Sequence, residues 1–459
     1  MSGSRPISRR QMLRMAVQGG VSATVLAACG PAQPQQGGTA GGGTAPGGQS
    51  RATGEIDFLA WGDSADLPGW DALIKRYAEI NPELKINLTT VAEPNNNFYP
   101  KLQTAIAGGK PPHLASFQGW EWQTYADRGL LQPLDELIAR DKLGPIYEQD
   151  IPALKDTTAR NGQRFLVPLQ LATMVMFYAR KPFDQAGIAY PTDDWTYAQF
   201  VDAARRLTDL SGDTKRFGFQ TNGNWFRDIH WIRSTGKREF DSLVDPRRAS
   251  FNQPELVEII QQVAQDFQYG QQISPKPADL QGGANTINTG NSAMKYEGPW
   301  FLSQLNSPKL RQDGKEVPFD VVLMPQGADA GRPHRGWSEG VAIFKSDRVE
   351  QAWAFASFAA SEEGQKIYSA ATGRMPNTLG LIESFWLPTV QETFQITNGK
   401  AFTEALRRSQ VDVIGKVPRS KMWAEVVKPL GWDPLQNNSA KAADVLPRVD
   451  EALQKLLDA

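Results

Sequence analysis

The first part of the chain after residue 54 alternates between strand and helix patterns, and this order is the feature that most restricts the fold. Strand patterns, with alternating or short apolar runs, cover 55–61, 84–91 and 114–117, and apolar residues at helical spacing cover 67–81 and 98–107. Strands joined through helices pair in parallel, because the connection must cross over the sheet. The order therefore predicts an α/β fold with a parallel-core sheet and helices on both faces.

The rest of the chain continues this mixed pattern. Further strands are predicted at 292–296, 320–324 and 340–345, and further helices at 196–207, 253–269, 350–360, 362–370 and 448–457. No repeat of 20–50 residues is visible, which argues against a solenoid. The length after residue 54 is enough for two or more domains.

The N-terminal stretch has the order of an export signal. Arg9 and Arg10 precede a short apolar run, residues 15–28, which is too short to span a bilayer and ends in Leu26-Ala27-Ala28-Cys29. This order resembles a bacterial lipoprotein signal, in which Cys29 is lipidated, and the twin arginines resemble a Tat signal. The resemblance implies a signal peptide over 1–28, a flexible Gly/Pro-rich linker over 29–54 and an extracytoplasmic protein held to the outer face of the membrane by lipid.

Composition excludes several classes of function. Cys29 is the only cysteine, so thiol catalysis and cysteine-based zinc sites are excluded once it is acylated. The sequence has only three histidines, which makes a metal site with several histidine ligands a poor fit. We expect no metal and no cofactor. The net charge is −1, and removal of residues 1–28, with four arginines and no acid, leaves −5. This balance is not typical of a protein that binds nucleic acid.

Four stretches taken together resemble the extracellular solute-binding proteins of sugar ABC importers, the class that includes maltose-binding protein. They are the helix, Asn-Pro turn and strand at 77–86, the segment at 101–112 with its continuation at 126–134, the Gly-Pro-Trp loop at 293–300, and the stretch at 336–365. The family usually has Pro-Asp where this chain has Pro112-His113. The last 80 or so residues resemble the family only loosely.

The resemblance implies a two-lobe periplasmic-binding-protein fold of the type II kind that closes over its ligand. Lobe I would comprise 55–168 plus 337–374, and lobe II would comprise 169–336 plus 375–459. The chain would cross between the lobes near 169–171, near 333–335 and near Arg374. Crossing strands of this kind allow hinge closure with few torsions changing. The implied protein is a monomer that binds a carbohydrate, delivers it to the membrane subunits of an ABC permease and is not an enzyme.

Tryptophan and acidic residues at predicted strand ends and crossings supply the candidate ligand contacts. Ligands of parallel sheets bind beyond the carboxyl ends of the strands. An indole offers a flat face to the C–H side of a sugar, and carboxylates and amides bond to its hydroxyls. The candidates are Trp61, Asp63, Gln118, Trp120, Glu121, Gln170, Trp225, Trp300, Trp337, Glu339 and Arg374.

Several alternatives remain open from the sequence. Trp61 and Trp337 fit core packing as well as ligand contact, and either Trp120 or Trp122 faces the ligand. Asp63 and Glu121 also fit helix caps or, in a glycoside hydrolase, a pair of catalytic acids. A non-sugar solute such as a phosphorylated polyol is another alternative. Trp70, Tyr77 and Trp353 lie on apolar helix faces and are predicted to be core residues.

Overall fold

The computed structural model describes residues 52–62, 66–91, 97–147, 151–327 and 332–459, which belong to one compact unit, 49–459. The predicted signal peptide, Cys29, most of the linker and Asp63 lie outside the described residues. Within the described residues, no helix combines the length and the apolar character that a membrane span needs.

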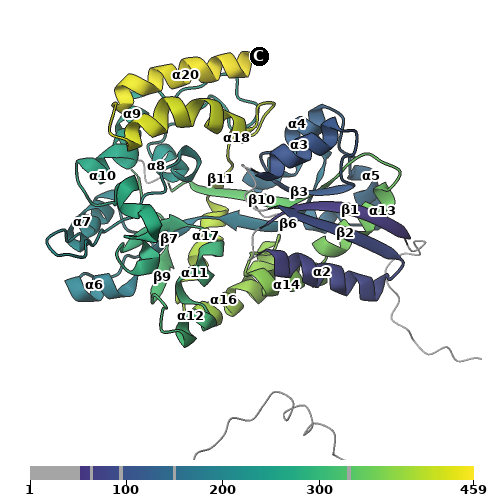
Figure 1. Ribbon diagram of the computed structural model, residues 1–459, viewed down its shortest axis with the longest axis horizontal. Helices are drawn as coiled ribbons and strands as arrows, with labels where there is room; N and C mark the ends of the chain where they lie inside the picture. Colours follow the sequence, from purple (N-terminus) through teal and green to yellow (C-terminus); the bar gives the residue numbers. More distant parts are fainter. Residues whose placement is uncertain (1–51, 63–65, 92–96, 148–150, 328–331) are drawn as a thin grey trace, which may run out of the picture. The chain divides into compact units, whose positions relative to one another are not determined.

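The first sheet is mixed and has six strands (Figure 1). Its strands are β1 (Gly54–Trp61), β2 (Leu84–Val91), β3 (Leu114–Gln118), β6 (Leu166–Thr173), β10 (His334–Ile343) and β11 (Ser409–Gln410). The order is β11-β10-β3-β1-β2, with β6 also paired to β10. β1 pairs in parallel with β2 and β3, as the strand and helix order predicts, whereas β10 is antiparallel to both β3 and β6.

A layer of aromatic packing holds helix α2 (Leu67–Ile80) to this sheet. Trp70, Leu73 and Tyr77 are the buried large side chains of α2, and their spacing places them on one face. Trp70 meets Phe58 of β1 edge to face at 5.0 Å between ring centroids. Trp353 of α13 (Val349–Ala360) is buried in the same core. The prediction that Trp70, Tyr77 and Trp353 are core residues is confirmed.

The second sheet differs from the predicted parallel core. Its strands β8 (Met294–Glu297) and β9 (Phe319–Val322) flank β7 (Val175–Ala179), and both are antiparallel to β7. The reason lies in the connectivity. β7 follows β6 from the first sheet after one residue, without a helical crossover. β8 and β9, which are joined through helices, run in the same direction as each other, and β7 lies between them in the opposite direction. Within the described residues, parallel pairing in this region is limited to single bridges such as that between Phe217 and Ser292.

The three predicted crossing segments lie side by side. Gln170 of β6 pairs with Glu339 of β10 and also forms a bridge with Pro376, which follows Arg374. The Thr173 hydroxyl donates a hydrogen bond to the Arg335 carbonyl over 2.8 Å. Every residue of β6 and β10 is buried, which is typical of central strands covered on both faces. The exact lobe boundaries remain predictions.

The remaining α-helices and strands complete the described part of the chain. They are α3 (Tyr99–Ala107), α4 (Gln123–Asp127), α5 (Asp135–Asp141), β4 (Ala159–Arg160), β5 (Gln163–Arg164), α6 (Arg180–Ala186), α7 (Tyr197–Leu207), α8 (Ile229–Arg233), α9 (Pro254–Gln261), α10 (Phe267–Tyr269), α11 (Leu302–Asn306), α12 (Pro308–Gln312), α14 (Glu362–Thr372), α15 (Leu379–Leu381), α16 (Leu387–Phe394), α17 (Lys400–Arg407), α18 (Arg419–Met422), α19 (Asp433–Gln436) and α20 (Ala442–Asp458).

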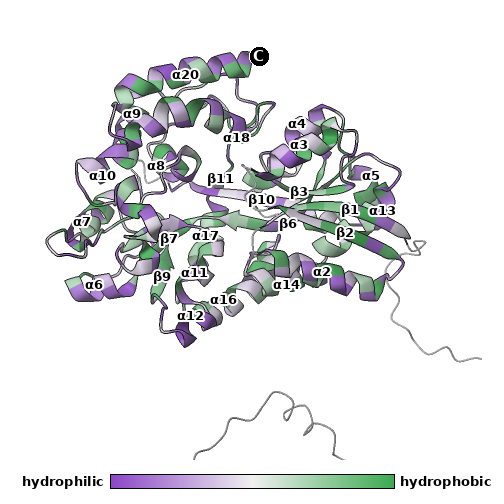
Figure 2. Cartoon of the chain, in the orientation of Figure 1, coloured by the Kyte–Doolittle hydropathy of each residue, from purple (hydrophilic) through white to green (hydrophobic). Residues whose placement is uncertain are grey.

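Helix α20 begins six residues earlier than the predicted start at residue 448. Its first turns bury Ala442, Val445 and Leu446, and the helix continues through Pro447. Hydrophobic and hydrophilic residues alternate around its axis (Figure 2). Burial of this apolar face outweighs the one hydrogen bond that the proline removes. The π-helical segment Trp423–Trp432 packs against α20 in the same core cluster.

Candidate ligand-binding site

Three of the predicted tryptophans meet in one cluster. Trp120 follows β3, Trp300 lies in the helical turn Pro299–Phe301 that follows β8, and Trp337 lies in β10. The ring centroids of Trp120 and Trp337 are 5.3 Å apart, and those of Trp300 and Trp337 are 5.8 Å apart. Trp120 and Trp337 are each only 2% exposed, whereas Trp300 is half-buried. Trp300 therefore has the most accessible indole of the three.

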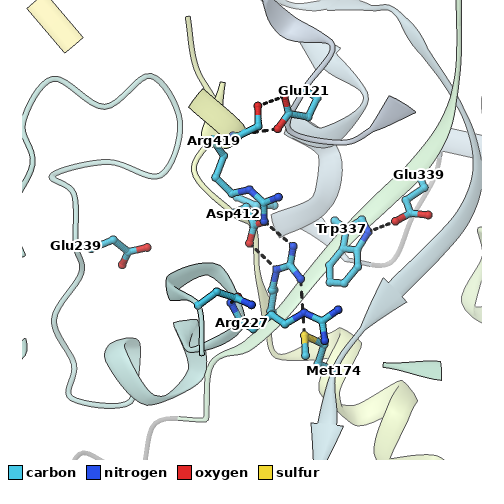
Figure 3. A network of polar contacts seen from close by, with 12 residues as sticks. Glu121, Met174, Arg227, Glu239, Trp337, Glu339, Asp412 and Arg419 are labelled. Atoms are coloured by element: carbon cyan, nitrogen blue, oxygen red, sulfur yellow. Dashed lines mark hydrogen bonds and ion pairs between the residues drawn. The ribbon is translucent and has the colours of Figure 1, made fainter. Parts of the chain in front are cut away.

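Carboxylates fix the planes of two of these indoles. Trp337 donates its indole N–H to Glu339 Oε1 over 2.6 Å (Figure 3). The Gln170 amide donates to Glu339 Oε2 over 2.8 Å. Trp300 donates its indole N–H to Glu297 Oε2 over 3.0 Å. Burial raises the pKa of Glu339, while the positive charge of Arg374 and the bond from Trp337 oppose this rise. The indoles of Trp337 and Trp300 are thus each held in place by a hydrogen bond to a carboxylate.

Two arginines lie over the indole rings. The Arg335 guanidinium carbon is 4.1 Å from the ring centroid of Trp337 and 4.8 Å from that of Trp120. The Arg419 guanidinium carbon is 4.3 Å from the ring centroid of Trp120 and 3.9 Å from that of Phe226. These distances lie within the range of cation–π contacts. The exposed area of Trp120 is small because these guanidinium groups cover it.

Asp412 holds both arginines (Figure 3). It accepts two hydrogen bonds from Arg335, at 2.8 and 2.7 Å, and one from Arg419 Nη1 at 2.9 Å. Burial by itself raises the pKa of Asp412, but the charges of Arg335 and Arg419 outweigh it, and the pKa is lowered. Burial lowers the pKa of Arg419 to about 10, against the opposing charge of Asp412. One carboxylate thus positions two cations beside the indoles.

Glu121 joins the loop after β3 to the C-terminal part of the chain. Its carboxylate accepts hydrogen bonds from the Ser420 backbone N–H at 3.1 Å and from the Ser420 hydroxyl at 2.8 Å. Burial raises the pKa of Glu121, and the charge of Arg419 together with the bonds from Ser420 opposes that rise. Arg419 therefore contacts Trp120, and Ser420 contacts the next residue, Glu121.

Several buried polar atoms at this place lack a hydrogen-bond partner within the described residues. They are Gln118 Oε1, Trp120 Nε1 and Arg419 Nε, and Trp61 Nε1 in the neighbouring core also lacks one. Trp61 and Gln118 end β1 and β3, two parallel neighbours, so they lie at the same edge of the sheet. A buried donor or acceptor without a partner costs about 1–3 kcal/mol. Such atoms are suited to bond with a polar ligand.

The structure separates other predicted site residues from the cluster. Trp225 is fully buried and packs against Phe240 and Phe251, with ring centroids 5.9 and 5.5 Å away, in a second hydrophobic core. Trp122 is also fully buried and donates its indole N–H to the Thr157 carbonyl. The side chain of Trp61 is 9% exposed and packs in the core that contains Trp122.

Arg374 lies between the cluster and an acidic residue before α2. It forms an ion pair with Asp66 at 2.7 Å, and its guanidinium carbon is 5.9 Å from the Trp300 ring centroid. Burial by itself lowers the pKa of Arg374, but the charges of Asp66 and Glu339 outweigh it and raise the pKa. Gln118 is paired with Glu339 across the sheet, which places it beside the cluster.

Sequence reasoning missed Phe226, Asp412 and the side-chain role of Arg335 and Arg419. Arg335 lies in the predicted crossing at 333–335, so the sequence indicated a position near the ligand but not the role of its side chain. Asp412 and Arg419 lie in the last 80 residues, where the resemblance is loose and no pattern marks them. No cluster of three or more His, Cys, Asp or Glu side chains suited to a metal ion occurs in the part of the chain that the structure describes.

Comparison with known proteins decides the family. The family described as bacterial extracellular solute-binding protein matches residues 61–366, which include most of the cluster. The chain belongs to this family. The solute-binding protein has the two-lobe fold of maltose-binding-protein-like proteins. It superposes with a TM-score of 0.74 and 24% identity on an ABC substrate-binding protein from Listeria monocytogenes in complex with cycloalternan, covering 88% of this chain and 99% of that one.

Several relatives by sequence have names that state a ligand. The solute-binding protein is 28% identical over 247 residues to an erythritol/L-threitol-binding protein of Mycolicibacterium smegmatis, which covers 48% of each chain. It is 22% identical over 358 residues to an arabinooligosaccharide-binding protein of Halalkalibacterium halodurans, which covers 75% of each chain. The family is one of extracellular proteins that bind solutes.

Proposed function

We propose that this protein captures a neutral carbohydrate at the cluster of Trp120, Trp300 and Trp337 and delivers it to an ABC permease without changing it chemically. The observation that carries the proposal is the meeting of three indoles beside Gln118 Oε1 and Trp120 Nε1, two buried polar atoms that have no hydrogen-bond partner within the described residues. Indole faces suit the C–H side of a sugar ring, and the unpartnered atoms suit its hydroxyls.

Within the cluster, Trp300 is the residue that we propose to stack on the ligand. It is half-buried, and its N–H bond to Glu297 fixes the plane of the ring. Trp120 and Trp337 are covered by Arg335 and, for Trp120, by Arg419. Gln118, Glu121, Gln170, Glu339 and Arg374 surround the rings, while Trp225 packs among phenylalanines and is not included in the proposed site.

The pairing of charges favours a neutral ligand over a phosphorylated one. Arg335 and Arg419 share Asp412, Arg374 pairs with Asp66, and Arg227 pairs with Glu297. A phosphate needs cations that are not already neutralised by carboxylates. Each of these arginines already has a carboxylate partner, although Arg335 and Arg419 share one, so none of them is a free cation. The names of the relatives, which cite erythritol, L-threitol and arabino-oligosaccharides, support polyhydroxylated ligands in general.

The proposed mechanism is closure of two lobes around the sugar. Lobe I, 55–168 plus 337–374, supplies Trp120 and Glu121, and lobe II, 169–336 plus 375–459, supplies Trp300 and Ser420. A ligand that contacts both lobes shifts the equilibrium toward the closed form by its difference in affinity for the two forms. The permease would recognise the closed form. A monomeric protein anchored by lipid on Cys29, exported by the Tat route and tethered through residues 29–54 fits this role.

A thermal-shift screen tests the proposed function. The panel is erythritol, L-arabinose, arabinotriose, maltose, maltotriose and glucose 6-phosphate, each at millimolar concentration. A ligand that binds the folded protein and not the unfolded chain raises the melting temperature. We expect at least one neutral member to raise it and to be recovered unchanged. A shift with glucose 6-phosphate alone, or with no member, would contradict the proposal.

A further inference from the structure

The side chain of Arg419 is held between two aromatic rings. Its guanidinium carbon lies 4.3 Å from the ring centroid of Trp120 and 3.9 Å from that of Phe226. The residue begins α18 in the C-terminal part of the chain, and it is 2% exposed. Contact with both rings restricts the orientation of the guanidinium group. Its N–H groups lie in the plane of that group and point outward from its edges.

Arg419 uses few of its donors. Nη1 donates to Asp412, and the buried Nε has no partner within the described residues. The neighbouring Trp120 Nε1 also lacks a partner there. Both atoms are donors that cannot accept a hydrogen bond. Two buried donors that have no acceptor within the described residues thus lie on side chains in direct contact, and oxygen atoms from a bound ligand would satisfy them.

The nearby carboxylates are occupied by other donors. Asp412 accepts two bonds from Arg335 in addition to the one from Arg419. Glu121 accepts from the N–H and hydroxyl of Ser420. Glu339 accepts from Trp337 and Gln170. None of these carboxylates bonds to Arg419 Nε or Trp120 Nε1 within the described residues.

We infer that Arg419 is a ligand-binding residue, positioned by Asp412, and that its Nε–H and the indole N–H of Trp120 donate to oxygen atoms of the bound sugar. This inference rests on the proposed function and deepens it. It assigns to the C-terminal segment a direct part in specificity, because the ligand must present an acceptor oxygen to these donors. It also gives Trp120 a different part from Trp300: Trp120 supports the guanidinium group and donates one hydrogen bond, while its ring face is taken by Arg419.

The test compares three variants with the wild-type protein by calorimetric titration, using the neutral sugar of the panel that shifts its melting temperature most. Arg419→Met keeps an unbranched apolar chain between the rings and removes the donors. Arg419→Lys keeps the charge beside Asp412 but not the planar fork. The control is Arg76→Met, because Arg76 pairs with Glu79 and Glu363 within the predicted lobe I, away from the indoles. We expect about a tenfold or greater loss of affinity for Arg419→Met, a smaller loss for Arg419→Lys and less than a twofold change for the control.

Deoxy analogues distinguish a direct contact from a structural role. Each monodeoxy analogue of the same sugar is titrated against the wild-type protein and Arg419→Met. We expect one analogue to bind about tenfold more weakly than its parent to the wild-type protein, and equally well as its parent to Arg419→Met, because the donor that reads the hydroxyl is gone. Equal penalties in both proteins for every analogue, or wild-type affinity in Arg419→Met, would overturn the inference while leaving the proposed function intact.

Two further outcomes distinguish the inference about Arg419 from the proposed function. Glucuronate, titrated beside glucose, presents a carboxylate to the same donors. If glucuronate bound more than tenfold more tightly than glucose, the acceptor would be an acidic group. That result would overturn the inference that Arg419 binds a neutral sugar. If no neutral sugar shifts the wild-type melting temperature, the proposed function fails, and the inference about Arg419 falls with it.

Discussion

Glu121 and Ser420 are 299 residues apart in the sequence, yet the carboxylate of the first accepts both the backbone N–H and the hydroxyl of the second. Glu121 follows Trp120 and Ser420 follows Arg419, so the polar contact lies directly beside the stacking of the arginine on the indole. In the predicted division of the chain, these pairs belong to different lobes. The contact is therefore a candidate for an interaction that forms only when the lobes approach.

Ser420→Ala is expected to favour separation of the predicted lobes. The change removes the hydroxyl donor at 2.8 Å and leaves Glu121 Oε2 buried with one bond fewer, at a cost of about 1–3 kcal/mol. Small-angle scattering of the unliganded variant should give a larger radius of gyration than the wild-type protein, and sugar affinity should fall about fivefold or more. Ser384→Ala, at an exposed serine that bonds within its own helix, serves as the control. A variant with the wild-type radius and affinity would show that this contact does not hold the lobes.

Trp300→Ala is expected to weaken sugar binding strongly while leaving the melting temperature almost unchanged. Trp300 is half-buried, and its partner Glu297 keeps its ion pairs with Arg227 and Lys295, so the fold loses little. Loss of the stacking face should lower affinity by tenfold or more in a calorimetric titration, the equivalent of about 1.4 kcal/mol or more. Tyr190→Ala, at an aromatic residue that is 40% exposed outside the cluster, should bind sugar normally. Equal affinity of Trp300→Ala and the wild-type protein would remove Trp300 from the site.

Cys29→Ser is expected to release the protein from the membrane. The hydroxyl cannot form the thioether that carries the lipid, and an acyl chain is what the proposed anchor contributes to membrane affinity. After cell fractionation, the wild-type protein should be found with membranes and the variant in the soluble extracytoplasmic fraction. Retention of the variant on washed membranes would contradict lipid anchoring at Cys29.

The strand and helix order of the first sheet was predictable because local patterns decide it. The alternation in β1 and β2 and the apolar face of α2 come from neighbouring residues. The antiparallel β7, β8 and β9 sheet was not predictable in the same way, because the direction of pairing depends on how β7 continues from the first sheet. The α20 start was missed because tertiary burial of Val445 and Leu446 outweighs the effect of Pro447.

The candidate site was predictable only where resemblance or strand ends marked it. Trp120, Trp300 and Trp337 were all predicted on those grounds to contact the ligand. In the structure, the ring centroid of Trp337 lies 5.3 Å from that of Trp120 and 5.8 Å from that of Trp300. Asp412 and Arg419 could not be found, because a buried ion pair leaves no periodic pattern in the sequence. Trp225 shows the reverse case: a polar loop surrounds it, but its ring packs against Phe240 and Phe251.

Asp228 provides a test of stability against pH that is independent of the sugar. Its carboxyl is fully buried, and burial raises its pKa to about 7, although the bond from Trp432 and the charge of Arg227 oppose the rise. The unfolded chain releases this proton near pH 4, whereas the folded protein keeps it up to about pH 7. Between these values the folded state binds more protons, so the free energy of unfolding falls as pH rises, by up to about 1.4 kcal/mol per pH unit from this group.

Asp228→Asn removes that proton linkage and keeps a neutral side chain of the same size. Urea unfolding between pH 4.5 and 7.5 should therefore show a smaller loss of stability with rising pH in the variant than in the wild-type protein, and the variant should gain relative to the wild-type protein as pH increases. Glu451→Gln is the control, because the hydrogen bond from Lys455 lowers the pKa of that exposed carboxylate, so its substitution should leave the dependence on pH over this range unchanged. Parallel curves for wild-type protein and Asp228→Asn over this range would show that Asp228 is ionised throughout and that its environment stabilises the charge.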